Sequence, residues 1–244
     1  MKRYISLFFL LFSFTSLLSG CGLSAIRSGL EEANTWFDRD QNFDTVSILQ
    51  YISDNWDAIN LAWLELESIP DLCALIPQEL QQWIKAVNLS RNDIETVDAD
   101  LSCFENLLGV DLSFNSISEL VWLWYLPMLR DLWLSQNKIE DLSSEFFSTF
   151  PWLEWLRLSY NKIKDISALS SVTSLLNLEL QHNDLTSLLW LENLERIEKL
   201  RLEFNELKED QLTYLNNLDQ LKDISWWYNK FKEEILLRRK DATN

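Results

Sequence analysis

The sequence predicts an α/β solenoid, a right-handed superhelix of 22 to 24 residues per coil with a parallel sheet on its concave side. A pattern of leucine-like residues ends in asparagine seven times, with spacings of 23, 22, 24, 22, 22 and 24 residues. These asparagines are Asn92, Asn115, Asn137, Asn161, Asn183, Asn205 and Asn229. Gly and Pro number only four each and 47% of residues are hydrophobic, which excludes collagen-like and disordered chains and supplies a long core.

Residues 1–20 are interpreted as an export signal. Lys2 and Arg3 precede an uncharged apolar run, Ile5 to Leu18, that is too short and too rich in small polar residues for a comfortable membrane span. The run ends in Leu18-Ser19-Gly20-Cys21, which resembles the lipobox of bacterial lipoproteins. The resemblance implies acylation of Cys21 and permanent attachment to a membrane of the cell envelope. Gly22, in place of Asp, implies the outer membrane in diderm bacteria, and the sequence does not decide between its periplasmic and its surface face. The alternative is an uncleaved signal in which Cys21 is an ordinary thiol.

Residues 21–82 are predicted to form the lipidated amino terminus, a linker and a helical cap. Asp44 is a candidate N-cap of a helix with Val46, Leu49 and Ile52 on one face. A degenerate copy of the repeat, Trp56-x-x-Ile59-x-Leu61, is counted with this cap. At the other end, residues 232–244 are predicted to form a second cap with a short charged helix. Caps are needed because the open ends of a solenoid expose core and unpaired strand edges.

Residues 83–231 are predicted to form about seven coils. The repeat pattern is Leu-x-x-Leu-x-Leu-x-x-Asn. The segment Leu129-Arg130-Asp131-Leu132-Trp133-Leu134-Ser135-Gln136-Asn137 fits it at every leucine and at the asparagine. The alternation in Leu132-Trp133-Leu134 turns the leucines inward, and parallel stacking buries a leucine column that one repeat could not bury alone. The asparagine amide is expected to pair backbone groups in the turn after the strand. Coils this short leave room for extended or short helical returns only.

These residues resemble the leucine-rich-repeat family, with the coil length that internalins share. The continuation Asn115-x-Ile117-x-x-Leu120-x-x-Leu123-x-x-Leu126-x-x-Leu129 carries the resemblance through a whole turn. The resemblance implies that partners bind on the concave face, at the variable positions between and just after the strand leucines. Trp122 and Trp190 fall on the opposite, convex side.

The charge balance and the motifs argue against several function classes. Without Lys2 and Arg3, 19 of the 21 basic residues remain against 38 acidic ones, a net charge of about −19, which disfavours nucleic acid and anionic lipid as partners. The sequence contains no Gly-rich phosphate loop, nucleophile elbow or metal-spaced His and Cys set. We therefore expect no enzyme, no catalytic residue, no metal and no cofactor.

The single histidine and two cysteines are interpreted as structural. His182 precedes Asn183, in a slot that holds Phe114, Tyr160, Phe204 or Tyr228 in other coils, so it is expected at the edge of the solenoid. Cys73 and Cys103 lack C-x-x-C spacing and have apolar sequence neighbours, so two free thiols are expected, with a disulfide as the alternative in an oxidising envelope.

The concave positions carry seven basic and seven acidic side chains and are therefore mixed in charge. Aromatic and arginine side chains are the usual anchors of protein interfaces. The residues predicted to bind a protein partner are Trp133, Trp155, Arg157 and Tyr160 in one patch, Arg201, Phe204, Trp227 and Tyr228 in a second, and Glu179 between them. We expect a monomeric, lipid-anchored binding protein. The alternatives are Trp-mediated binding of carbohydrate or cell-wall glycan, and a structural scaffold without a dedicated ligand.

Overall fold

The computed structural model describes residues 43–53, 56–120 and 125–230 and divides into two compact units, Met1–Tyr51 and Ile52–Asn244. The predicted signal peptide, Cys21 and the cap at 232–244 lie outside the described residues. In the first unit, helix α3 (Thr45–Ile48) is followed by a 3-10 turn, η3 (Leu49–Tyr51). Oδ1 of Asp44 accepts a hydrogen bond from the backbone N–H of Ser47 at 2.7 Å. The predicted N-cap is thereby confirmed.

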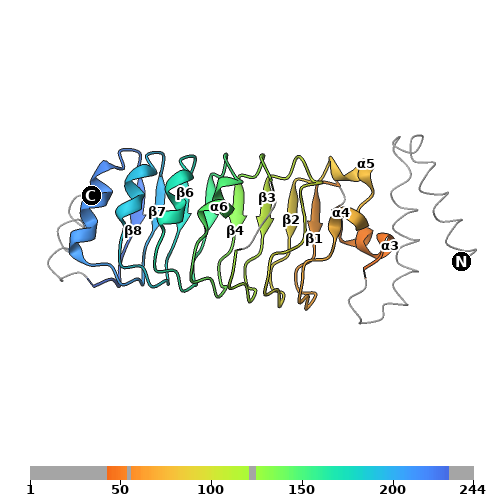
Figure 1. The fold of residues 1–244 in the computed structure, drawn as a ribbon, viewed down its shortest axis with the longest axis horizontal. Coiled ribbons are helices and arrows are strands. Elements are labelled where there is room, and N and C mark those ends of the chain that lie inside the picture. Colours follow the sequence, from red (N-terminus) through yellow and green to blue (C-terminus); the bar gives the residue numbers. More distant parts are fainter. Residues whose placement is uncertain (1–42, 54–55, 121–124, 231–244) are drawn as a thin grey trace, which may run out of the picture. The chain divides into compact units, whose positions relative to one another are not determined.

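The second unit is a stack of coils around one parallel sheet (Figure 1). Its eight strands pair in chain order: β1 (Ala58–Asn60), β2 (Ala86–Asn88), β3 (Gly109–Asp111), β4 (Asp131–Trp133), β5 (Trp155–Arg157), β6 (Asn177–Glu179), β7 (Lys199–Arg201) and β8 (Asp223–Ser225). The predicted solenoid with a parallel sheet is thereby confirmed, while its right-handed sense stays a prediction. The degenerate copy that was counted with the cap supplies β1, and Ile52 forms an antiparallel bridge with Ile59.

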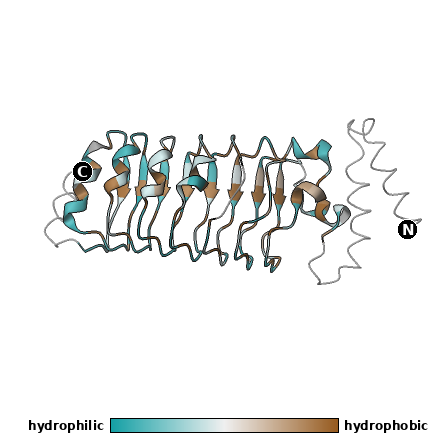
Figure 2. Cartoon of the chain, in the orientation of Figure 1, coloured by the Kyte–Doolittle hydropathy of each residue, from teal (hydrophilic) through white to brown (hydrophobic). Residues whose placement is uncertain are grey.

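Two columns of apolar side chains fill the inside of the solenoid. The first contains the middle residue of each strand, from Ile59 to Leu200, and ends in the partly exposed Ile224. The second contains the residue just after each strand, from Leu61 to Leu202, and ends in Trp226, which is 6% exposed. Figure 2 shows brown, hydrophobic residues recurring in the strands of successive coils, next to teal and white residues. Each residue of a column packs against the coils before and after it, so the core is continuous through all eight coils.

The return segments are short, as predicted from the coil length. They contain α4 (Leu72–Leu75), α5 (Gln78–Gln81), α6 (Ser144–Ser148) and three 3-10 helices, η4 (Ser167–Ser171), η5 (Leu189–Asn193) and η6 (Glu209–Asn217). In the part of the chain that the structure describes, no helix has the length and hydrophobicity needed to cross a membrane.

The seven asparagines join neighbouring coils through their side-chain amides. Asn161 is representative: its Nδ2 donates to the carbonyls of Leu134 and Leu158 at 2.9 and 3.1 Å, and its Oδ1 accepts from the N–H of Ile139 at 3.0 Å. Each of the other six likewise donates to its own and the preceding coil and accepts from the preceding coil. The predicted structural role of the asparagine is thereby confirmed, because these bonds satisfy backbone groups that the turn leaves unpaired.

The expectation of two free thiols is wrong, because Cys73 and Cys103 form a disulfide with their Cα atoms 5.7 Å apart. Cys73 lies in α4, on the return side between β1 and β2, and Cys103 lies on the next return, between β2 and β3. Both residues are partly exposed rather than buried in the apolar core. The bridge therefore ties two successive returns together.

Candidate functional site

The concave face is defined here as the solvent side of β1 to β8, where the first and third residues of each strand point outward. The strand register aligns Trp133 with Arg157, Arg157 with Glu179 and Glu179 with Arg201 on successive strands. The Arg157 guanidinium lies over the Trp133 ring, 4.8 Å from its centroid. The Nε atom of Arg157 is also 3.6 Å from Oε1 of Glu179. Side chains of three strands thus form one connected row.

Arg201 extends the row toward the last strand. Its guanidinium donates two hydrogen bonds to the carboxylate of Asp223, one of them 2.8 Å long. The hydrogen bond raises the pKa of Arg201 and lowers the pKa of the Asp223 carboxyl. Because Asp223 is exposed and Arg201 only partly so, the pair is a surface ion pair that fixes the arginine in place.

Four buried polar atoms have no hydrogen-bond partner among the described residues: Nε1 of Trp133, Nε of Arg157, Oε1 of Gln181 and Oε2 of Glu203. All four belong to side chains in the coils of β4 to β7, on or just after the strands of the concave face. Buried polar atoms are usually paired, and an unpaired one costs roughly 1–3 kcal/mol. Their concentration on one face sets this part of the surface apart.

A column of planar side chains follows the edge of the concave face, at the position before each asparagine. These residues have positive φ angles, for example 56° at Tyr160, 58° at His182 and 54° at Phe204. The ring centroids of Tyr160 and His182 are 4.0 Å apart, those of His182 and Phe204 are 4.1 Å apart, and those of Phe204 and Tyr228 are 4.3 Å apart, with nearly parallel planes. Both ring faces of His182 and of Phe204 are therefore covered.

The same column continues in the first coils with a cation between two rings. The Arg91 guanidinium lies 4.6 Å from the ring centroid of Trp63 and 4.0 Å from that of Phe114. Gln136, at φ 59°, occupies the same position between Phe114 and Tyr160. We call the eight residues the edge stack: Trp63, Arg91, Phe114, Gln136, Tyr160, His182, Phe204 and Tyr228.

The structure places every residue of the two predicted patches on the concave face or its edge. Trp155 and Trp227 are 37% and 48% exposed, and Tyr160, Phe204 and Tyr228 all belong to the edge stack, joined through His182. Sequence reasoning did not foresee this stack, although the recurrence of flat side chains before the asparagine was its signal. It also passed over Met128 and Trp152, exposed to 43% and 57% on the turns before β4 and β5.

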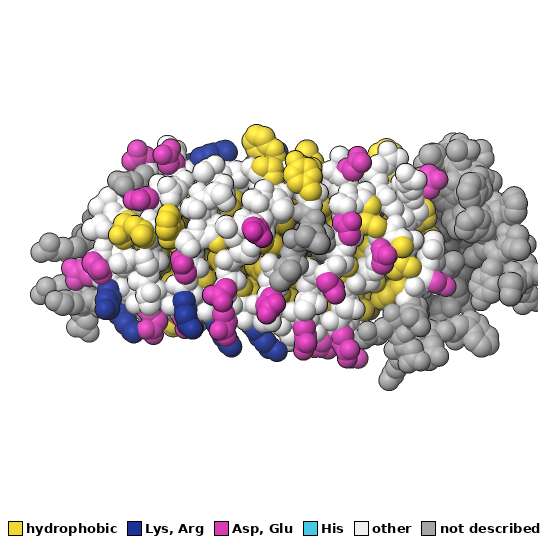
Figure 3. Space-filling model, in the orientation of Figure 1, with side chains coloured by type: hydrophobic (Ala, Val, Ile, Leu, Met, Phe, Trp, Pro, Cys, Tyr) yellow, Lys and Arg dark blue, Asp and Glu magenta, His cyan; other side chains and the backbone are white. Residues whose placement is uncertain are grey.

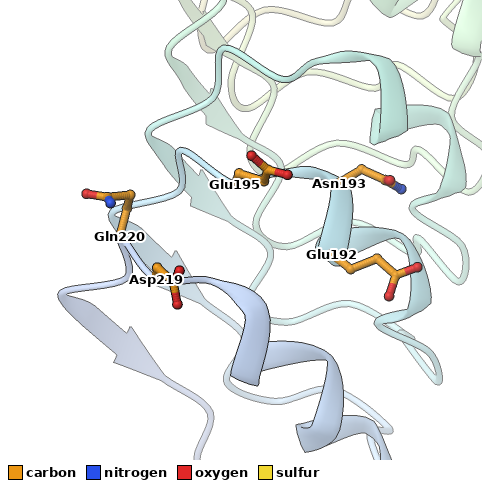
Figure 4. Close-up of a pocket in the computed structure, with 5 residues that line it drawn as sticks. All are labelled: Glu192, Asn193, Glu195, Asp219 and Gln220. Carbon is orange, nitrogen blue, oxygen red and sulfur yellow. The ribbon is translucent and has the colours of Figure 1, made fainter.

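Neither the distribution of charged side chains nor the hollow near η5 indicates a further binding site outside the concave face on the described part of the chain. Figure 3 shows acidic side chains spread over the visible face, with the basic ones gathered mainly along one edge. A hollow of about 560 Å³ near η5 is lined by Glu192, Asn193, Glu195, Asp219 and Gln220. Its carboxylates come from two coils and are spread around the hollow (Figure 4). Within the described residues, no group of three or more His, Cys, Asp or Glu side chains could hold a metal ion.

Comparison with known proteins supports the fold. A sequence model of the family described as leucine rich repeat matches residues 127–185. The chain is 37% identical to lumican of Mus musculus over 119 residues, which are 47% of this chain and 34% of lumican. It is 36% identical to lumican of Bos taurus over 129 residues, 50% of this chain and 36% of that protein. The chain thus spans about a third of the length of these curated relatives.

Solved structures of internalins from Listeria monocytogenes are similar in fold. For InlF the TM-score is 0.51 at 19% identity, covering 72% of this chain and 56% of that one. For the functional domain of InlJ, which includes a cysteine ladder, the TM-score is 0.55 at 23% identity, covering 70% of this chain and 34% of that one. At these identities the likeness concerns the fold alone.

Proposed function

We propose that the concave face of this leucine-rich-repeat solenoid binds another protein. The observation that carries the proposal is the exposure of Trp155 and Trp227, 37% and 48%, on the same face as the stacked Trp133 and Arg157. Exposed Trp155 and Trp227 on the same face supply the aromatic anchors of a protein interface.

The covered ring faces favour a protein over a carbohydrate partner. Sugars stack on free aromatic faces, but both faces of His182 and Phe204 are occupied, and the Arg157 guanidinium covers one face of Trp133. The ring edges that remain can contact the mixed polar and apolar surface of a protein. Glycan binding is the second candidate, and it would depend on the exposed Trp155 and Trp227.

A crosslinking experiment tests the proposal. A photo-reactive amino acid is placed at Asn177, beside Trp155 in the sheet, and in a matched variant at Trp190, which is 41% exposed on η5. We expect a defined envelope or host protein to be captured from Asn177 but not from Trp190, and to be lost when Trp155→Ala is added. Failure of both variants to capture a protein contradicts the proposal and favours a scaffold without a dedicated ligand.

We further propose that the protein is attached to the bacterial envelope by acyl chains on Cys21, on the outer membrane in a diderm cell. The lipobox-like residues Leu18-Ser19-Gly20-Cys21 and Gly22 support this proposal. Radiolabelled palmitate is expected to enter the protein and to be lost in Cys21→Ser. Unchanged labelling in that variant, or a mature mass that retains residues 1–20, contradicts the anchor without affecting the proposal for the concave face.

A further inference from the structure

Gly109 is the only glycine in residues 30–244 of the sequence, and it is the first residue of β3. Strands β3 and β4 lie side by side near the middle of the stack (Figure 1). A glycine weakens a strand, because it has no side chain to pack against its neighbours. Where one occurs inside a strand, it usually marks a bulge, a bend or the close approach of another molecule.

The backbone of β3 gives no reason for a glycine at this position. Gly109 pairs in continuous parallel register with Ala86 on β2 and with Asp131 on β4, so the strand has no bulge here. Its φ angle lies outside the left-handed region that favours glycine. A Cβ atom at Gly109 would lie 3.7 Å from Cβ of Asp131, an ordinary contact, and would meet no other described atom beyond its chain neighbours within 4 Å. The position has room for a side chain, and the glycine leaves that room open.

Two aspartates lie beside this open space. Asp131 is directly across from Gly109 on β4, and Asp111 is two residues further along β3, on the same face of the sheet. At a strand spacing of about 4.8 Å and a rise of about 3.3 Å per residue, their Cα atoms lie about 5 and 7 Å from that of Gly109. We call the space over Gly109, with Asp111 and Asp131 beside it, the glycine gap.

The basic side chains nearest to the glycine gap are already paired with other acids. Arg130 forms an ion pair with Glu154. Arg157 lies 3.6 Å from Glu179 and over the Trp133 ring. Among the described residues, neither aspartate of the glycine gap forms an ion pair. The gap therefore keeps two carboxylates that no cation of the described chain neutralises.

Both carboxylates have oxygen atoms left to accept hydrogen bonds. The Asp131 side chain makes no hydrogen bond with another described residue. Burial and the charge of Glu154 raise the pKa of Asp131 more than Arg157 and Arg130 lower it, so its ionised form is less stable here than in water. One oxygen of Asp111 accepts a hydrogen bond within its own turn, and the other accepts none from the described residues. A cation in the gap would stabilise both carboxylates.

Trp155 lies on the other side of Asp131, as its neighbour on β5, and is 37% exposed. No described ring or cation stacks on Trp155. Trp133 differs, because it is only partly exposed and already has the Arg157 guanidinium 4.8 Å from its ring centroid. The Trp155 indole is thus open to the aliphatic stem of a long basic side chain whose charge lies in the glycine gap.

We propose that the glycine gap receives a lysine or arginine side chain of the partner protein; this inference rests on the proposed protein-binding function. The charged head lies over Gly109, between the carboxylates of Asp111 and Asp131, and the stem contacts Trp155. Two carboxylates without a basic partner favour a cation and disfavour an acidic group, and the missing side chain of Gly109 leaves the space for it. The formal net charge of −17 attracts a basic partner toward this face.

The test is an NMR titration of the isotope-labelled full chain with two cationic probes, N-acetylarginine amide and N-acetyllysine amide. The control ligand is N-acetylcitrulline amide, which has the shape of the arginine probe without its charge. We expect the cationic probes to cause saturable shifts of the amide signals of β3 to β5, and the citrulline probe to cause none. Binding of neither cation, or equal binding of the citrulline probe, overturns the inference.

Three variants locate the bound cation. Asp131→Asn should weaken binding of the cationic probes at least fivefold. Asp219→Asn, which removes the same charge from the hollow near η5, should change it less than twofold. Gly109→Val fills the gap with a residue that strands favour, so it should weaken binding at least fivefold with an unchanged circular dichroism spectrum. If Gly109→Val does not fold, the two aspartate variants decide, and equal losses in both would overturn the inference, because the probes would then respond only to the overall charge.

The failure of this inference and the failure of the proposed function are distinguishable. If a protein is crosslinked at Asn177 in a Trp155-dependent manner, and Asp131→Asn captures it as well as the wild type does, the partner places no basic side chain in the glycine gap. In that case only this inference is wrong. If the cationic probes bind in the gap but no protein is captured from Asn177, the gap binds a free cation, and both proposals are wrong about a protein partner.

Discussion

The first three coils and the last five share one core but present different surfaces. In the coils of β2 and β3, Asn88 and Asp111 accept hydrogen bonds from backbone N–H groups two residues later, at 3.0 and 2.9 Å. Each side chain thereby stabilises the turn of its own coil. At the same position in the next coils, Trp133 and Arg157 contact each other across strands, and Nε1 of Trp133 and Nε of Arg157 make no hydrogen bond within the described residues.

This difference shows how the solenoid separates stability from binding. The leucine columns, the asparagines and the positive φ angles recur in both regions, so the backbone does not depend on which residue points outward. Where the outward residue serves its own turn, one of its acceptor atoms is already engaged in that turn. Where it reaches across coils instead, unpaired donors and exposed rings remain, and those coils are the place to expect a binding site.

The first region also holds the disulfide, and removing it should have the largest effect on stability. Replacing both Cys73 and Cys103 with alanine is expected to lower the free energy of unfolding by about 3–4 kcal/mol, because the bridge closes a loop across a sequence separation of 30 residues. Urea melts of oxidised wild type and double variant measure the difference. With a strong reductant present the two proteins should melt almost alike. A double variant as stable as the oxidised wild type would mean that the bridge does not stabilise the first coils.

Replacing an asparagine that joins two coils should lower the stability more than replacing Asn88, which bonds only within its own turn. Asn137→Ala and Asn161→Ala are each expected to destabilise the solenoid by roughly 1–3 kcal/mol. Each substitution leaves backbone carbonyl and N–H groups of two coils without their hydrogen-bond partner. Asn88→Ala removes one local hydrogen bond and should cost less than about 1 kcal/mol. Chemical melts of the three variants decide the matter. Equal losses of unfolding free energy in all three variants would show that Asn137 and Asn161 do not stabilise the solenoid by joining neighbouring coils.

The edge stack offers a smaller contrast between the two regions. Phe204→Ala removes ring contacts on both faces and is expected to cost about 1–2 kcal/mol, at roughly 0.5–1.5 kcal/mol per aromatic pair. Phe114→Ala removes the contact with the Arg91 guanidinium, at about 0.5–1 kcal/mol for an exposed cation–π pair. Urea melts measure both losses. A cost for Phe114→Ala that matches or exceeds the cost for Phe204→Ala would contradict the idea that stacking on two faces stabilises the later coils.

The smallest effects concern pH and two aspartates of the later coils. Burial raises the pKa of Asp131 above 3.8, so its contribution to stability is present below that pH and lost as the pH rises through the raised value. Asp131→Asn should therefore increase the melting temperature slightly at pH 7 and have little effect near pH 3.

Asp223 provides the control of opposite sign. The hydrogen bond from Arg201 lowers the Asp223 pKa, so the contribution of this residue is present above 3.8 and lost as the pH falls through the lowered value. Asp223→Asn should accordingly lower the melting temperature at pH 7. Thermal melts at both pH values test the pair, and shifts of the same sign at pH 7 would be inconsistent with this assignment.

The coils could be predicted from the sequence because the repeat spacing and the residue types required by the fold occur at the same positions. Leu132, Leu134 and Asn137 have both the spacing and the side chains that the fold requires. The disulfide could not be read from the pattern, because 28 residues separate Ala58 from Ala86 and the extra length forms α4 and α5, which carry Cys73 to the next return. The position before the asparagine was predicted to lie at the edge of the solenoid, but the stacking of its side chains was not, because they differ in type and share only a left-handed backbone and a flat shape.

The candidate site was predictable in part for the same reason. Strand alternation and coil spacing suffice to align Trp133 with Arg157, and the structure stacks the two side chains. Which polar atoms remain unpaired depends on side-chain packing between coils, which no spacing encodes. The exposure of Trp152 depends likewise on the shape of a turn outside the repeated pattern.

The most direct test of the central claim measures the affinity of concave-face variants for the captured partner. Trp133→Ala and Trp155→Ala should each weaken binding at least tenfold, about 1.4 kcal/mol, with an unchanged circular dichroism spectrum, while Trp190→Ala binds like the wild type. If both concave variants bind normally and Trp227→Ala does not, the binding site lies in the last coil and the assignment to the coils of β4 and β5 is wrong.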